Sequence, residues 1–191
     1  MEPSKASCLK ARQNLSGLRA GVINCRGYQV QEKLGEKFDI VVSFSVLEHV
    51  YRRLEYLRSA KECLKEDGYF LINYDSGHFT DGGEKLITAI GKALVKLGVE
   101  RYYQSFVREG DFRRMLAKTG LKILEEKFFN TGLKDIYKAI PESGREDYMK
   151  RWLEFELRLN ELGIEYDDSR AGFFRTRNFI LARGGIAVEN P

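Results

Sequence analysis

The chain has 191 residues and a mass of 22.0 kDa, which suits one domain with or without an appended segment and excludes two independent enzymes. Hydrophobic residues make up 43% of the sequence and charged residues 31%, so the composition predicts a soluble globular protein and excludes disorder. The 32 lysines and arginines against 28 aspartates and glutamates give a net charge of +4, too small to indicate a nucleic-acid-binding protein.

The cysteines and the apolar runs indicate in which cellular compartment the protein lies. Cys8, Cys25 and Cys63 are odd in number and far apart, which fits neither a disulfide framework nor a zinc cluster. No apolar run approaches the ~18–20 residues of a membrane span, and the N-terminus lacks the apolar core of a signal peptide. We therefore expect a cytoplasmic protein with reduced, mostly buried thiols, no membrane contact and no metal site.

The first half of the chain predicts a strand–helix–strand unit. Residues 3–14 predict a helix that Ser4 can cap, and residues 21–25 predict a short strand. Residues 38–45 form an apolar run typical of a parallel strand in the middle of a sheet. An amphipathic helix that ends at Gly68 and a strand at 69–74 follow; the helix is indicated by apolar residues at three- and four-residue steps, namely Leu47, Val50, Leu54, Leu57, Ala60 and Leu64.

The second half continues this alternation and then breaks it. Helices are predicted at 86–97 and 111–118, and a strand at 121–124, which together favour an α/β fold with a largely parallel sheet. We interpret residues 134–170 as a helical insertion or lid within a single domain of residues 1–183. The final strand at 173–182 alternates with polar residues, as an edge or antiparallel strand does, and residues 184–191 look like a frayed tail.

Two segments carry a family resemblance. EKFDIVVSFSVLEHV at 36–50 and KECLKEDGYFLINYDSG at 61–77 resemble the fourth strand, following helix and fifth strand of class I S-adenosylmethionine-dependent methyltransferases, in the small-molecule, methyltransferase-type-11-like branch. REGDFRRMLAKTGLKILEE at 108–126 resembles the next helix and strand of that family. The resemblance implies a Rossmann-like fold, with a mostly parallel twisted sheet, flanking helices and an antiparallel C-terminal strand. It also implies S-adenosylmethionine as the cofactor.

The resemblance suggests which residues meet the cofactor. Glu2 falls at the end of the second strand of the family, where a carboxylate accepts hydrogen bonds from the ribose; alternatively, Glu2 stabilises the start of the following helix. Tyr28 falls near the adenine position and either stacks on adenine or is a structural turn residue. Phe44, Ser45 and Val46 are the strongest candidates, because ligands bind beyond the carboxyl ends of strands in open α/β sheets.

The glycine-rich cofactor loop of the family would precede Glu2, and no GxGxG motif occurs in the 191 residues. We therefore expect a truncated domain that lacks the first strand–helix unit. Its loss would leave an exposed sheet edge, through which the chain would assemble with a second copy or another chain.

Several side chains are candidates for the substrate side of such a site. A base for the acceptor could come from His49 or Asp75, although His49 can also pack or cap its helix and Asp75 can be a turn residue. Tyr74 is expected at the substrate edge of the cleft, whereas His78 is expected to be solvated. Trp152, in the aromatic stripe of the insertion, either walls a small acceptor or belongs to the core or a dimer contact.

These features favour methyl transfer to a small-molecule acceptor by direct displacement. At the position of Ser43 to Val46, enzymes that methylate nucleic-acid bases typically have a sequence that resembles Asn/Asp-Pro-Pro-Tyr. This chain has Ser-Phe-Ser-Val there, so base methylation is disfavoured. Two alternatives stay open. One is a noncatalytic remnant of the fold that acts as an assembly partner, and the other is a basic nucleic-acid module.

Overall fold

The computed structural model describes residues 1–75, 84–97, 99, 103–105, 107–130, 134–162 and 175–184. These residues form four strands, which are β1 (Phe38–Ser43), β2 (Leu64–Asp75), β3 (Leu121–Asn130) and β4 (Arg175–Arg183). The helices are α1 (Lys5–Asn14), α2 (Val30–Lys33), α3 (Arg53–Glu62), α4 (Glu84–Lys96), α5 (Glu109–Thr119), α6 (Lys134–Ala139) and α7 (Glu142–Glu161), with short 3-10 turns η1 (Gly27–Gln29) and η2 (Leu47–His49).

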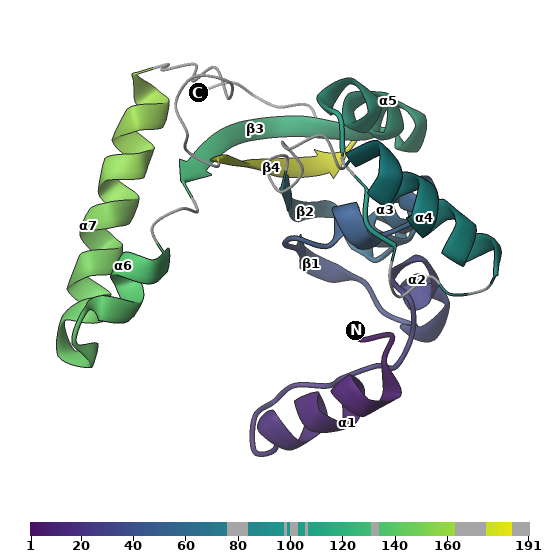
Figure 1. Ribbon diagram of the computed structural model, residues 1–191, viewed down its shortest axis with the longest axis horizontal. Helices are drawn as coiled ribbons and strands as arrows, with labels where there is room; N and C mark the ends of the chain where they lie inside the picture. The colour runs from purple at the N-terminus through teal and green to yellow at the C-terminus, as the bar shows by residue number, and fades with distance from the viewer. Residues whose placement is uncertain are drawn as a thin grey trace.

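The strands form one sheet in the order β1-β2-β4-β3 (Figure 1). β1 and β2 are parallel, and β4 is antiparallel to both β2 and β3, so β1, β2 and β3 all run in the same direction. The predicted α/β fold with mostly parallel strands and an antiparallel C-terminal strand is confirmed. β4 lies between two strands and not at an edge, which is why two of the three ladders are antiparallel.

The hydrophobic core lies on one face of this sheet. Phe70, Ile72 and Tyr74 alternate along β2 and point to the same side as Phe179 and Leu181 of β4. α3 and α5 cover this face, and a single cluster of buried residues joins them to the strands. In Figure 1, α3, α4 and α5 lie to one side of the sheet, and α6 and α7 lie at the other, beyond the end of β3.

The position of β1 differs from the prediction. Its apolar sequence indicated a central strand, but β1 is the outermost strand of the sheet, and no other described residue pairs with its free edge. As a result, the side chains of Ile40 and Val42, on the face opposite α3, are 58% and 54% exposed. The apolar run therefore indicates a strand that could be covered on both faces, whereas the described part of the chain covers one.

The strand predicted at 21–25 is wrong, because these residues form no ladder. A single backbone hydrogen bond, from Glu2 N to Ile23 O at 2.9 Å, joins the segment to the N-terminus. The other hydrogen bonds of this segment involve side chains. Arg12 donates to Val22 O, and Asn24 donates to Glu2 O and Pro3 O.

The predicted helix end at Gly68 is also wrong. α3 ends at Glu62, and β2 begins at Leu64, so Gly68 lies inside a strand. A Cβ atom at Gly68 would come 2.9 Å from Phe38 O and 3.0 Å from Asp39 O. Glycine is needed here because the backbone of β1 passes this close, at the point where the β1–β2 register shifts.

The other predicted helices are confirmed. Ser4 caps α1, since its Oγ accepts a hydrogen bond from Ser7 N, and Gly120 ends α5 in the left-handed conformation with φ +69°. The described part of the predicted insertion is helical, and Asn160 of α7 anchors it by hydrogen bonds to Phe128 N and Phe128 O. Residues 163–170 lie outside the described residues, as does the tail beyond Gly184.

The three cysteines are free and buried, as expected. Burial raises the pKa of the Cys25 and Cys63 thiols. None of the described helices combines the length and the apolar character that a membrane crossing requires.

Candidate functional site

The loop that follows β1 lies at the carboxyl end of a parallel strand, where open α/β sheets bind ligands. It consists of Phe44, Ser45 and Val46, and η2 begins directly after it. The Phe44 side chain is 53% exposed, although an aromatic ring of this size gains free energy when it is covered. Ser45 has a left-handed backbone, with φ +51°. The loop therefore presents an uncovered ring and a sharply turned backbone at the expected ligand edge.

β2 and β4 hold this loop in place. Ser45 N donates a hydrogen bond to Asn73 Oδ1 at 2.7 Å, and Asn73 Nδ2 donates to Asn178 Oδ1 at 3.0 Å. Asn73 and Asn178 stand directly opposite each other in the β2–β4 ladder. Sequence reasoning did not single out either residue, and the one available signal was an asparagine within the apolar strand at 69–74.

η2 contains a buried acid and, next to it, an exposed histidine. Glu48 is buried, whereas His49 is exposed and its backbone N donates to Val46 O at 2.9 Å. Arg53 of α3 braces the turn by donating to Leu47 O and to Ser105 O. Burial lowers the pKa of the Arg53 guanidinium, and the nearby Tyr103 and Glu48 oppose that shift. The structure thus places His49 directly after the loop, with its side chain exposed.

Tyr56 ties α3 to the end of β1. Its hydroxyl donates to Ser43 Oγ at 2.6 Å in a buried position. Burial raises the pKa of Tyr56, because the phenolate would be desolvated there. The Tyr56 ring also lies against Gly27, where an added Cβ would come 2.3 Å from the ring and 2.9 Å from the Met1 side chain. These contacts bring the N-terminus, η1 and the end of β1 together.

Glu2 and Tyr28, the predicted cofactor residues of this N-terminal region, already have protein partners. Glu2 Oε1 accepts a hydrogen bond from Ser4 N at 2.8 Å, next to the start of α1. Tyr28 is half-buried against the core, and Arg26 donates to its hydroxyl at 2.6 Å. The guanidinium carbons of Arg26 and Arg52 lie 5.9 and 5.3 Å from the Tyr28 ring centroid. The structural alternatives for both residues therefore have direct contacts in support.

Tyr74 does not lie at the cleft edge where it was expected. It is 1% exposed and points into the core, with its ring centroid 5.0 Å from that of Phe112 and 5.8 Å from that of Phe179. Burial raises the pKa of its hydroxyl well above the ordinary tyrosine value. The reason is the two-residue period of β2, which turns Tyr74 to the face of Phe70 and Ile72, whereas Asn73 faces the other side.

The remaining predicted residues are only partly described. The backbone of Asp75 ends β2 and pairs with Thr176, but the Asp75 side chain and the whole of His78 lie outside the described residues. Trp152 lies on α7, where its ring centroid is 6.3 Å from Tyr148 and 5.6 Å from Phe155. The structure does not bring Trp152 into a described contact with the loop after β1.

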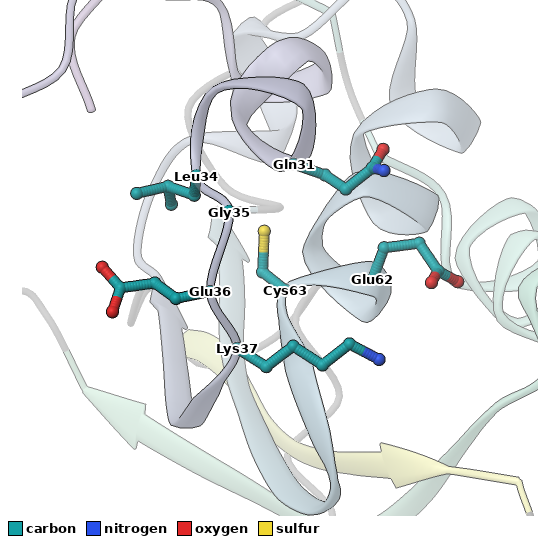
Figure 2. A pocket seen from close by; sticks show the side chains of 7 residues that line it. All are labelled: Gln31, Leu34, Gly35, Glu36, Lys37, Glu62 and Cys63. Atoms are coloured by element: carbon teal, nitrogen blue, oxygen red, sulfur yellow. The ribbon is translucent and has the colours of Figure 1, made fainter.

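A pocket of about 250 Å³ lies at the opposite end of β1. Figure 2 shows the Cys63 thiol pointing into it, between the chain that leads into β1 and the end of α3. Its lining residues are Gln31, Leu34, Gly35, Glu36, Lys37, Glu62 and Cys63. Because this pocket is at the amino end of the strand, it is separate from the site at Phe44–Val46. Within the described ranges, no group of three or more metal-ligating side chains is gathered.

Comparison with known proteins provides the family context. The sequence pattern of the methyltransferase domain family matches residues 7–126, which include most of α1, the loop after β1 and most of β3. The helices α6 and α7 lie outside the matched range. A comparison with curated proteins gives no match.

Solved structures of the same fold include two methyltransferases and a cyclopropane synthase. The O-methyltransferase of a trans-AT PKS multienzyme from Brevibacillus brevis, in complex with S-adenosyl-L-homocysteine, has a TM-score of 0.51 and 16% identity, over 94% of this chain and 56% of that one. A SAM-dependent methyltransferase from Leishmania major has a TM-score of 0.53 and 12% identity, over 94% and 52% of the two chains.

The third structure is a cyclopropane synthase from Mycobacterium tuberculosis, with a TM-score of 0.51 and 17% identity over 94% of this chain and 67% of that one. At these identities the likeness concerns the fold, and it confirms the Rossmann-like architecture. The chain spans only about half the length of the Brevibacillus and Leishmania proteins.

Proposed function

Since the chain belongs to the methyltransferase domain family, we propose that it binds S-adenosylmethionine at the Phe44–Val46 loop and takes part in methyl transfer to a small-molecule acceptor. The observation that carries this proposal is the exposed Phe44 ring beside the left-handed Ser45, at the carboxyl end of β1. The S-adenosyl-L-homocysteine bound to the Brevibacillus relative supports the choice of ligand.

The residues present fit such a ligand in part. Phe44 offers an apolar surface for the flat adenine ring, and the backbone of Ser45 and Val46 offers polar groups beside it. The Tyr28 ring and the second carboxylate oxygen of Glu2 complete the set that the family resemblance suggests. When bound, the cofactor supplies an electrophilic methyl group on a sulfonium, and the protein contributes alignment and the exclusion of water.

His49 is the base that we propose for the acceptor. His49 is exposed and comes three residues after Val46, and a ring nitrogen of its imidazole can accept the proton of an acceptor within hydrogen-bond reach. Asp75, at the carboxyl end of β2, is a second candidate at the same edge of the sheet. Trp152 on the α6–α7 segment is a candidate wall for the acceptor. In an assay with a methyl acceptor, His49→Asn should lower turnover and leave the cofactor affinity within about twofold of the wild-type value.

Calorimetric titration with S-adenosylmethionine and S-adenosyl-L-homocysteine tests the binding proposal. Phe44→Ala should weaken binding by about tenfold, because the ring surface against the ligand is lost. Tyr69→Ala is a matched control, since Tyr69 is an aromatic side chain that is 47% exposed in the middle of β2, where it is paired with Ile40 and not with the loop after β1. Equal losses in both variants would contradict the proposed location.

A second candidate function is assembly without catalysis. The observation in its favour is the free edge of β1, with Ile40 and Val42 uncovered beside it. Cofactor affinity separates the two functions. A cooperatively folded protein that gives no heat with millimolar ligand, yet associates with itself or another chain, would favour the assembly role.

A further inference from the structure

Ser45 is the only residue other than glycine that has a left-handed backbone in the described part of the chain. For a residue with a Cβ atom, this conformation is disfavoured by roughly tenfold relative to the right-handed one. Such a conformation persists where the surrounding structure fixes it, and residues of this kind gather at ligand-binding sites. The question is which neighbours of Ser45 supply the constraint.

Two asparagine side chains supply it. Ser45 N–H can only donate, so Asn73 must present its carbonyl oxygen, and the 2.7 Å contact to Oδ1 has this polarity. The Asn73 Nδ2 group then points away from Ser45 and must find an acceptor. Asn178 Oδ1 accepts it at 3.0 Å, which fixes the orientation of the Asn178 amide in turn. These two hydrogen bonds therefore connect the loop after β1 through β2 to β4.

The register of the sheet brings Ser45, Asn73 and Asn178 close together. Asn73 and Asn178 are directly opposite in the β2–β4 ladder, and Ser43, two residues before Ser45, is paired with Ile72. Both asparagines lie on the sheet face away from α3 and α5, because Ile72, Tyr74 and Phe179 occupy the core face. Ser45 itself lies between Phe44 and Val46, so its backbone angles set the directions of both neighbours.

We propose that Asn73 and Asn178 are positioning residues, which hold Ser45 in its left-handed conformation and thereby aim Phe44 at the ligand edge. The effect on binding rests on the proposed cofactor function, whereas the effect on the loop does not. A glycine at position 45 adopts the left-handed conformation without a steric penalty. Ser45→Gly should therefore make the loop independent of the two amides.

Amide hydrogen exchange of Ser45, followed by NMR, tests the loop without any ligand. Asn73→Ala should speed the exchange of Ser45 N–H by about tenfold or more, and Asn178→Ala should speed it by a smaller factor. Asn160→Ala is the matched control, because Asn160 bonds the backbone of Phe128 on β3, at the opposite edge of the sheet from β1, and its loss should leave Ser45 unchanged. Unaltered Ser45 exchange in a folded Asn73→Ala protein would overturn the proposal.

Binding of S-adenosyl-L-homocysteine, measured by calorimetry in a double-mutant cycle, tests the consequence. Asn73→Ala should weaken binding by about tenfold when residue 45 is serine and by less than about twofold when it is glycine. Equal losses in both backgrounds would overturn the positioning role, since a general structural defect would not depend on residue 45. If the wild-type protein does not bind the ligand, the proposed cofactor function fails, and the exchange experiment alone decides on the positioning role.

Discussion

Gly68 lies inside β2, directly against the backbone of β1. Its position within hard contact of Phe38 O and Asp39 O leaves no room for a methyl group. We expect Gly68→Ala to lower the free energy of unfolding by about 1–3 kcal/mol, because the two strands must separate to admit the Cβ atom. Gly35→Ala, where a Cβ would meet nothing within 4 Å, is the control. Urea denaturation should distinguish them, and similar stabilities of the two variants would contradict the close approach.

Glu109 is the residue for which the structure predicts a pH effect. Its carboxylate accepts from Arg113 Nε at 2.9 Å and lies 2.6 Å from a guanidinium nitrogen of Arg177. These contacts, the Arg113 hydrogen bond foremost, hold the pKa of Glu109 below its usual value of 4.5. A carboxyl group with a lowered pKa in the folded state adds stability above its unfolded pKa, and this stability is lost as pH falls through the folded pKa.

The melting temperature should therefore decline as pH falls below about 4.5, and Glu109→Gln should make this decline shallower. Glu161→Gln is a suitable control, because the Glu161–Arg158 pair lies on the exposed surface of α7. Thermal unfolding followed between about pH 7 and pH 3 provides the measurement. Identical acid profiles for the wild-type and Glu109→Gln proteins would show that the Glu109 contacts contribute nothing to folding.

The candidate site was predictable from sequence at some residues and not at others. Phe44, Ser45 and Val46 could be placed near the end of β1 because the apolar run at 38–45 marks the strand, although β1 ends two residues earlier, at Ser43. The left-handed backbone of Ser45 could not be predicted, since it depends on the amide of Asn73, 28 positions away in sequence. Tyr74 was misplaced because the choice of face depends on a register that only the assembled sheet fixes.

At the scale of elements, the docking of α3 on β1 rests on a buried polar contact. Tyr56→Phe removes the hydroxyl that donates to Ser43 Oγ and leaves that oxygen without this buried donor. We expect a loss of about 1 kcal/mol in the free energy of unfolding. Tyr69→Phe, at an exposed position on β2, should have little effect. Chemical denaturation of both variants checks this, and an unchanged stability of Tyr56→Phe would show that the contact is not needed for docking.

Helices with clear local signals were predicted best. α1 has its Ser4 cap and α5 its Gly120 stop, and both signals act within a few residues of the helix end. The neighbours of a strand are set by distant segments, which is why β1 was expected in the centre of the sheet and the segment at 21–25 was expected to be a strand. The composition of a strand indicates what kind of surface it can pack against, but it does not indicate which segments of the chain lie beside it.

At the scale of the whole molecule, the sheet is covered by α3 and α5 on one face and leaves Ile40 and Val42 exposed on the other. Apolar side chains beside a free strand edge favour association with another chain.

We expect concentration-dependent self-association, measured by light scattering. Val42→Lys should reduce it, because a charge at this position opposes burial. Leu97→Lys, an exposed position after α4, is the control, and a protein that stays monomeric at high concentration would contradict the assembly role.

The match to residues 7–126, and coverage of about half of two structural relatives, make cofactor binding by this chain the central question. Chemical-shift mapping of the backbone amides during titration with S-adenosyl-L-homocysteine answers it most directly. The proposal predicts that the largest changes fall at Phe44, Ser45 and Val46, with further changes near Tyr28. Changes confined to the pocket around Gly35 and Cys63, or none at millimolar ligand, would contradict it.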